Sequence, residues 1–375
     1  MGRFARPTWV EIDLNKLKRN FHRIERIVGK RKIIGAVKAD AYGHGAVEVS
    51  KILEKEGIYA LSVASLEEAL KLRENGIKAS ILVLGYVVPS ALPVAAKFSI
   101  PVTLFDKRFI KRLREYRGDH VLNIHINVDT GMGRIGVDPA EVPEIINALS
   151  VLPNVALQGI YTHLSTADSD VRYANEQLNI FEKILDKIKK KGALPPIIHA
   201  ANSAAILNLK RSYLNAVRPG LLLYGLTPLD EPIREFEPIM NFKTRAIYSR
   251  LVPKGTAVSY GRTYITTEET LIATLPVGYA DGYSRSLSNI GEVLIKQRRA
   301  RIIGNITMDQ MMIDVTGFPY IHPGNEVVLI GKQGEEVITP YEIAKKINTI
   351  NYEIVSRIGG RIPRTFIYNS HVKKY

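Results

Sequence analysis

The first two-thirds of the chain alternates short apolar segments with longer segments whose apolar residues recur every three or four positions. Short apolar runs are typical of buried parallel strands, and the longer period is typical of amphipathic helices. The first helix is expected between Asp13, a good N-cap, and Gly29. Eight strands separated by helices indicate an α/β fold of the (β/α)8 TIM-type barrel class. The expected strands are 32–37, 59–63, 80–84, 101–104, 121–128, 155–161, 197–200 and 216–217, with helices that include 65–75, 106–116, 139–150, 174–191 and 203–209.

The pattern changes after about residue 236, where short strands are separated by Gly and Pro turns. We therefore expect two domains, a barrel over residues 1–235 and a mainly β domain over residues 236–375. Residues 1–12 are a possible exception to this division, because a strand expected at 9–12 is a candidate to join the β domain. The strands expected in the second domain are 242–251, 270–276, 292–295, 301–303, 310–315 and 326–330, with one helix at 339–346.

Composition narrows the class of protein. Of the 375 residues, 46% are hydrophobic and 24% are charged, and no apolar run is long enough to cross a bilayer. The chain has no cysteine, which excludes thiolate metal sites, and the N-terminus lacks the apolar core of a signal peptide, so we expect a cytoplasmic protein without a metal site. The net charge of +15 is spread along the chain without an aromatic RNA-binding motif, so neither nucleic acid nor membrane is an expected partner.

Lys38 directly follows the apolar run 33–37 and precedes Tyr42, Gly43 and Gly45. A lysine at the carboxyl end of a buried strand loses solvation, which lowers its pKa toward a reactive amine. Such an amine can form a Schiff base with an aldehyde cofactor. Taken alone, the same position also fits a strand-end lysine that points into solvent.

Further polar residues follow the later strands of the expected barrel. Arg134 comes after the fifth strand, His163 after the sixth, Asn202 and Ser203 after the seventh, and Arg218 after the eighth. Because the loops after barrel strands meet at one end, we expect these side chains to converge on Lys38. Each has an ordinary structural alternative as well, such as a helix-capping serine or a histidine satisfied within the core.

The segment 37–45, Val-Lys-Ala-Asp-Ala-Tyr-Gly-His-Gly, resembles the pyridoxal phosphate (PLP) attachment motif of alanine racemases. The resemblance covers nearly the whole chain in the order of the family. It continues at residues 125–136, 161–168, 199–204, 217–225, 258–264, 276–282, 307–310 and 349–353.

The resemblance implies PLP as the cofactor, attached to Lys38. An arginine beside the pyridine nitrogen can only donate, which leaves that nitrogen neutral and stabilises a carbanion weakly. A short-lived carbanion suits a proton exchange at Cα. By resemblance, Arg218 contacts the ring nitrogen, His163 and His199 support the ring or its contacts, and the remaining cofactor-binding residues are Tyr42, Asn202, Ser203, Gly220, Leu221 and Tyr352.

Racemisation needs a proton removed from one face of Cα and delivered to the other. The resemblance implies that Lys38 serves one face and that Tyr260, supplied by the partner subunit of a homodimer, serves the other. A tyrosine base needs a positive neighbour at neutral pH, because its ordinary pKa is about 10. Arg134 is the candidate neighbour, and Tyr279 and Met308 match residues that line the substrate's way in and contact its carboxylate.

Two positions depart from the family. Many members have a carbamylated lysine where this chain has Asn127, so we expect a small anion such as chloride near Arg134, or a direct bond between Asn127 and Arg134. The usual cysteine before the methionine is Thr307, which should leave its backbone contact intact.

The implied activity is the interconversion of L- and D-alanine, which would supply D-alanine for peptidoglycan. Alternatives are a barrel racemase of other or broader specificity, a barrel decarboxylase, a non-enzymatic PLP carrier and, remotely, a nucleic-acid binder. The decarboxylases use a cysteine that this chain lacks, and the carriers lack a β domain. Residues 131–136 also match the dinucleotide pattern GxGxxG, but the helix that follows begins late and no acidic residue lies near 152–155.

Overall fold

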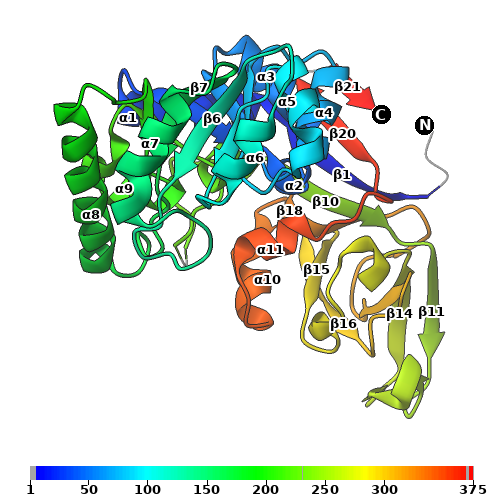
Figure 1. Ribbon diagram of the computed structural model, residues 1–375. Helices are drawn as coiled ribbons and strands as arrows, with labels where there is room; N and C mark the ends of the chain where they lie inside the picture. Colours follow the sequence, from blue (N-terminus) through cyan, green and yellow to red (C-terminus); the bar gives the residue numbers. More distant parts are fainter. Residues whose placement is uncertain (1–5, 230, 369–370, 375) are drawn as a thin grey trace.

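The computed structural model describes residues 6–229, 231–368 and 371–374, within which eight parallel strands close into the predicted barrel (Figure 1). The strands follow chain order, and the last pairs with the first. Closure brings all the carboxyl ends to one rim, where the connecting loops can gather side chains. The strands are β2 (Lys32–Ala36), β3 (Ala60–Val63), β4 (Ser80–Val83), β5 (Val102–Leu104), β6 (Leu122–Asn127), β7 (Val155–Tyr161), β8 (Ile197–His199) and β9 (Ala216–Val217).

Helix α1 (Leu14–Val28) shows how the local sequence sets the bounds of a helix. The Asp13 carboxylate accepts hydrogen bonds from the amides of Asn15 and Lys16, at 2.9 and 3.0 Å, and so satisfies donors that have no partner within the helix. Gly29, with φ of 65°, ends the helix in a conformation that other residues avoid. The face toward the core is apolar at helical spacing and buries Leu14, Leu17, Phe21, Ile24 and Val28.

The remaining barrel helices follow the predicted order, but α6 and α7 begin three residues after their predicted starts at 106 and 139, and the start of α8 differs in the other direction. This helix begins three residues before the predicted start at 174, because the Asp170 carboxylate caps the amides of Arg172 and Tyr173 at 3.0 and 3.1 Å. Within the described residues, none of the helices combines the length and the apolar content needed to cross a membrane. The helices are α3 (Ala46–Lys55), α4 (Leu66–Glu74), α5 (Leu92–Lys97), α6 (Phe109–Glu115), α7 (Val142–Ser150), α8 (Val171–Lys190) and α9 (Ser203–Asn208).

The second half of the chain is mainly β, as predicted, and the described residues form a sheet of eleven strands there. Strand β1 (Thr8–Asp13), from the N-terminal side of the barrel, lies in this sheet between β10 and β20; residues 1–5 are outside the described range. The other strands are β10 (Met240–Arg245), β11 (Tyr248–Val252), β14 (Thr270–Leu275), β15 (Glu292–Ile295), β16 (Arg298–Ile303), β17 (Met311–Asp314), β18 (Glu326–Gln333), β19 (Glu336–Ile338), β20 (Arg364–Tyr368) and β21 (His371–Lys374), with a separate hairpin of β12 (Ala257–Val258) and β13 (Tyr264–Ile265).

Two predictions for this half are wrong. The segment 242–251 is two strands rather than one, because the chain changes pairing partners after Ala246, whose amide bonds to Asn325 while that of Ile247 bonds to Thr274. The single predicted helix at 339–346 corresponds to α10 (Pro340–Lys346), and a second helix, α11 (Asn351–Ser356), follows it.

The segment α2 (Lys38–Tyr42), directly after β2, is an unusual turn. Its residues 39–42 all have positive φ, between 51° and 56°, so the turn is left-handed. This conformation costs L-residues roughly 1–2 kcal/mol each, and such strain persists only where the surroundings enforce it. The Glu68 carboxylate is part of those surroundings, because it accepts from the amides of Ala39 and Ala64, both at 2.7 Å.

The turn is also held against the β half of the molecule. A Cβ on Gly43, which has φ of 81°, would lie 2.4 Å from the carbonyl oxygen of Val355 in α11. The Arg364 guanidinium of β20 donates to the Gly43 carbonyl at 3.1 Å, and the His44 ring stacks on Tyr224 at 4.6 Å. Lys38 therefore lies on a segment that both halves of the protein fix (Figure 1).

We expect Gly43→Ala to destabilise the protein much more than Gly76→Ala. Gly76 has almost the same φ, 83°, but nothing lies within 4 Å of a Cβ placed there, so this control measures only the cost of the left-handed conformation, about 1–2 kcal/mol. Gly43→Ala adds a clash with the Val355 backbone. Urea denaturation gives the free energies of unfolding. Equal values for the two variants would contradict the close contact between Gly43 and the Val355 backbone.

Candidate active site

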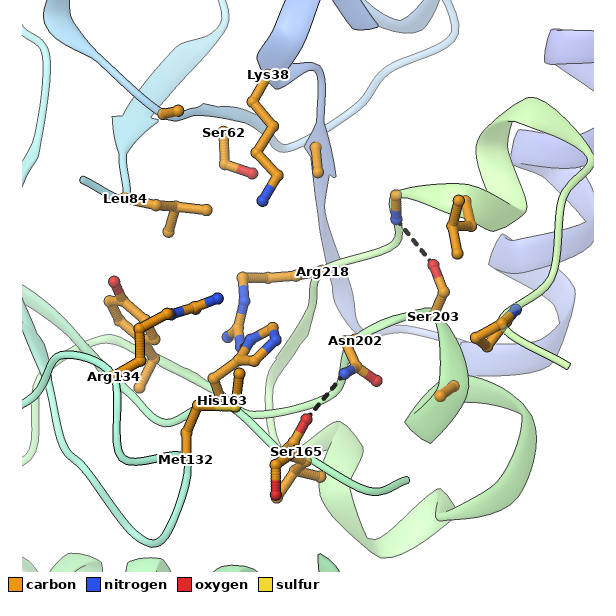
Figure 2. Close-up of a pocket in the computed structure, with 18 of the residues that line it drawn as sticks. Lys38, Ser62, Leu84, Met132, Arg134, His163, Ser165, Asn202, Ser203 and Arg218 are labelled. Carbon is orange, nitrogen blue, oxygen red and sulfur yellow. Dashed lines mark hydrogen bonds between the residues drawn. The ribbon is translucent and has the colours of Figure 1, made fainter. Parts of the chain in front are cut away.

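A cavity of about 520 Å³ lies at the rim formed by the carboxyl ends of the barrel strands (Figure 2). Its polar side chains come from segments far apart in the sequence that follow β2, β6, β7, β8 and β9, together with α11. Figure 2 shows the amine of Lys38 directed into the space that Arg134 and Arg218 border. The predicted residues that line the cavity are Lys38, Tyr42, Arg134, His163, Asn202, Ser203, Arg218, Gly220, Leu221 and Tyr352.

Lys38 is the candidate nucleophile of the cavity. Burial lowers the pKa of its amine, Arg134 lowers it further by charge repulsion, and Glu68 acts in the opposite sense. A lowered pKa increases the fraction of neutral amine at neutral pH, which is the form that attacks a carbonyl carbon. The left-handed turn fixes the backbone from which this side chain extends.

Hydrogen-bond donors converge at another part of the wall. The Ser203 hydroxyl accepts from the Gly220 amide at 2.9 Å, which leaves its own proton free to donate. Leu221 opens the short turn η4 (Leu221–Tyr224), so its amide has no partner within that turn. A Cβ on Gly220 would lie 2.8 Å from the Tyr42 hydroxyl, so only glycine leaves this space open.

Two tyrosines complete this group of donors. Burial, with a contribution from Tyr352, raises the pKa of Tyr42 to about 12, and burial also raises the pKa of Tyr352. Both phenols therefore keep their protons at neutral pH and can donate them. Hydroxyls and free amides in this arrangement suit a phosphate group.

Arg218 is buried in the floor of the cavity and is held by several acceptors. One terminal nitrogen donates to the Thr162 and Ala200 carbonyls at 2.7 and 3.1 Å, and the other donates to His199 Nδ1 at 2.5 Å. Its Nε makes no hydrogen bond to any described residue and remains available to a ligand. Burial lowers the pKa of Arg218 to about 10, so the guanidinium is still charged at neutral pH.

The histidines around Arg218 are neutral. Burial and the charge of Arg218 lower the pKa of His163 to about 3 and that of His199 well below its ordinary value. His163 lines the cavity, whereas His199 lies beneath it and contacts Arg218. The positive charges at the cavity are thus those of Arg134, Arg218 and any protonated Lys38, an arrangement that favours anionic ligands.

The structure bears on the two predicted departures. The Asn127 amide nitrogen donates to the Ile135 carbonyl at 3.0 Å, and within the described residues no hydrogen bond joins Asn127 to Arg134. The direct-bond version of the prediction is therefore wrong, because the loop after β6 brings the Ile135 carbonyl to the amide instead. The Thr307 carbonyl accepts from the Tyr279 amide at 3.0 Å, a bond that does not involve the side chain at this position, and the predicted contact with the substrate stays a prediction.

Tyr260, Tyr279 and Met308 do not line the cavity of their own chain. All three lie in the β half with exposed side chains, and Tyr260 is 75% exposed. The turn that carries Tyr260 is nevertheless fixed, because Ser259 Oγ donates to the Asn305 carbonyl at 2.6 Å and Asn305 Nδ2 donates to the Tyr260 carbonyl at 2.8 Å. These residues can act only at a site on another molecule or after a rearrangement.

The sequence interpretation missed Ser62, which lies in β3 opposite Ala36 and lines the cavity. Its hydroxyl is buried and has no hydrogen-bond partner among the described residues, so it is free to contact a ligand (Figure 2). A polar residue near the carboxyl end of the apolar run 59–63 was the available indication.

Comparisons with known proteins agree along the whole chain. The alanine racemase N-terminal domain matches residues 12–228, and the alanine racemase C-terminal domain matches residues 239–366. An alanine racemase of Halothermothrix orenii is 46% identical over 370 residues, which are 97% of this chain and 98% of that protein.

Solved structures give the same result. The crystal structure of alanine racemase from Bacillus anthracis with bound L-Ala-P has a TM-score of 0.94 at 40% identity and covers 100% of this chain and 99% of that one. A histidine racemase from Leuconostoc mesenteroides has a TM-score of 0.90 at 26% identity and covers 97% and 99%. Both halves of the sequence and their arrangement in space thus match one group of enzymes, and the chain belongs to the alanine racemase family of amino-acid racemases.

Proposed function

We propose that this enzyme interconverts L- and D-alanine with PLP bound at Lys38, and that its D-alanine is used for peptidoglycan. The observation that carries the proposal is the convergence, in one cavity, of an amine of lowered pKa, a buried arginine and a group of phosphate donors. Identity of 46% to an alanine racemase favours alanine over the substrates of more distant relatives.

The residues of the cavity fit PLP. Tyr42, Ser203, Tyr352 and the amides of Gly220 and Leu221 would hold its phosphate, and Arg218 would offer its Nε to the ring nitrogen. Asn202 and His163 border the same space. When bound, PLP supplies an aldehyde that links to amines and a ring that withdraws electrons from the substrate Cα.

The arginine sets how strongly the ring withdraws electrons. Arg218 stays protonated and is a donor only, so it leaves the ring nitrogen neutral, whereas an aspartate would accept from that nitrogen and keep it protonated. Negative charge at Cα is then stabilised only weakly, and reprotonation follows quickly. This environment favours racemisation over reactions that need a long-lived carbanion.

Two bases act on opposite faces of Cα in this proposal. Lys38 exchanges a proton on one face, and Tyr260 of the partner subunit in a homodimer exchanges a proton on the other. Arg134, on the rim, supports a negative phenolate and binds substrate, while Tyr279 and Met308 border the route by which substrate enters. The exposure of Tyr260 and its absence from its own cavity support a site completed by a second copy.

A chiral assay with L-alanine, L-serine and L-histidine tests the activity and its substrate. We expect alanine to have the highest kcat/KM of the three. A preference for histidine would instead match the histidine racemase that shares this fold. Loss of the amino or carboxyl group instead of inversion would contradict racemisation itself.

We expect Lys38→Ala to lose both turnover and the covalent attachment of the cofactor. Removing the base should lower turnover by about 10⁴-fold, the upper range for a positioned acid–base group. Borohydride reduction of the wild-type holoenzyme followed by peptide mapping should label Lys38. Lys51→Ala, on the exposed side of α3, is the control and should retain full activity; labelling of another lysine in the wild type would refute the attachment site.

We expect Tyr260→Phe to retain the cofactor and to lower turnover by about 10²–10⁴-fold. The two enantiomers have equal free energy, so kcat/KM must fall equally in both directions. The direction of the defect appears instead in the isotope effect: Cα-deuterated L-alanine should show a larger effect in the variant than in the wild type. Tyr320→Phe, at a tyrosine that is 82% exposed in the same half of the chain, is the matched control.

Mixing the two inactive variants tests whether the site is shared between subunits. If Lys38 of one subunit works with Tyr260 of the other, a heterodimer of Lys38→Ala and Tyr260→Phe contains one intact site. After unfolding and joint refolding of equal amounts, about a quarter of wild-type activity should return, because half of the dimers are mixed and each has one working site. A mixture that stays inactive while the wild type refolds would place both bases within one chain.

A further inference from the structure

A line of polar side chains, of which Arg218, His199 and His125 are buried and Gln158 is half-buried, runs from Arg218 to the opposite end of the barrel. Arg218 donates to His199 Nδ1, His199 Nε2 lies 3.1 Å from His125 Nδ1, and His125 Nε2 lies 3.3 Å from Gln158 Oε1. Gln158 and His125 border a small pocket among the amino-terminal ends of the strands, away from the cavity of Lys38. The line therefore connects the arginine to a residue that no ligand in the cavity can touch.

The backbone is shaped to make the last contact. In the pairing of β6 with β7, Ile124 lies opposite Leu157 and His125 lies opposite Gly159, so Gln158 is an extra residue in a β-bulge. Bulges of this kind redirect a side chain at the cost of regular pairing. Gly159 is also required, because a Cβ there would lie 2.3 Å from His125 Nδ1.

The donor and acceptor of every bond follow from Arg218. A guanidinium can only donate, so His199 Nδ1 must accept and the proton of a neutral His199 must be on Nε2. His199 then donates to His125 Nδ1, which places the His125 proton on Nε2 and requires an acceptor, Gln158 Oε1. The opposite order would set two N–H groups against each other at Arg218.

Both rings are neutral, as this order requires. Burial lowers the pKa of His125 to about 4 and that of His199 well below its ordinary value. Among the described residues, the titratable groups nearest the two rings are Arg218, Tyr161, whose ring stacks on His199 at 4.7 Å, and Tyr59, which borders the small pocket with His125. Burial raises the pKa of Tyr161, so this neighbour is neutral as well.

We propose that Gln158 and His125 are positioning residues that fix the tautomer of His199 and thereby hold Arg218 with its Nε toward the cofactor. The inference rests on the proposed function, since it assigns Arg218 to the ring nitrogen. If the proton of His199 moves to Nδ1, the ring repels the guanidinium, and one of its two terminal nitrogens loses its acceptor, while the other stays bonded to the Thr162 and Ala200 carbonyls. Gln158 prevents this change of tautomer, because its oxygen at the far end of the barrel accepts from His125 Nε2.

The tautomers can be measured in the protein without its cofactor. In apoenzyme labelled with 15N-histidine, we expect the nitrogen shifts of His199 and His125 to show a proton on Nε2 and none on Nδ1. Gln158→Leu removes the terminal acceptor and should give a mixture of tautomers at both rings. A proton on His199 Nδ1 in the wild type, or unchanged tautomers in Gln158→Leu, would overturn the proposal.

A second variant, Gln158→Glu, keeps the acceptor but changes the dependence on pH. A carboxylate beside His125 raises the pKa of that ring, and below the raised value His125 donates from both nitrogens. His199 must then accept at Nε2 and present its proton to Arg218. Turnover should match the wild type at alkaline pH. Below the pKa of His125 it should fall by about tenfold per pH unit, because binding of a single proton abolishes activity.

The control is Asn123→Asp, the same amide-to-acid change two residues before His125 on β6. Among the described residues the His125 ring bonds to His199 and Gln158 and not to Asn123, so this change adds charge without replacing a partner of the ring. Its pH profile should follow that of the wild type. The proposal would be overturned if turnover of the control also fell at acid pH. It would also be overturned if turnover of Gln158→Glu did not change as His125 becomes protonated, with that protonation followed by the 15N shifts. If the wild type has no racemase activity, the proposed function is refuted instead. The 15N shifts of the apoenzyme would still test the proposed tautomers.

Discussion

The left-handed turn at residues 39–42 is the constraint on which the arrangement of the molecule depends. It begins with the lysine of the cavity, and it is fixed on one side by the Glu68 carboxylate of the barrel and on the other by Arg364 and the Val355 backbone of the β half. Residues with side chains adopt this conformation only when their surroundings supply the free energy. The β half therefore acts on the cavity indirectly as well as through Tyr352 in its wall, because it helps to enforce the backbone that carries Lys38.

The electrostatics of the cavity follow from placing two arginines, the buried Arg218 and the exposed Arg134, near this lysine with few anions beside them. Burial, with repulsion from the arginines, lowers the pKa values of Lys38 and His163. The same surplus of positive charge would attract a phosphate and a carboxylate. Burial and these charges thus act in the same sense on the amine and the histidines, and the charges also select the class of ligand.

The sequence predicts those parts of the structure that local chemistry decides. An apolar run of suitable length marks a buried strand wherever its neighbours lie, which is why the barrel strands and the residues that follow them could be predicted. The division of 242–251 depends on an exchange of partners between β18 and β14, and the left-handed turn depends on contacts from β20 and α11. The bulge at Gln158 depends on the ring of His125 across the sheet, so no local pattern reveals it.

Tyr260 shows why an exposed side chain can still be preorganised. Its turn includes Ser259, with φ of 65°, and hydrogen bonds to Asn305 fix the backbone on both sides, although the phenol itself points to solvent. Ordering a mobile loop on association would cost conformational entropy, whereas a rigid turn has already lost it during folding. A rigid turn that lies outside the cavity of its own chain suits a residue offered to a second copy. If the two subunits share their sites in this way, the cavity of one chain holds the cofactor and a single base, and racemisation begins only when a partner supplies the other.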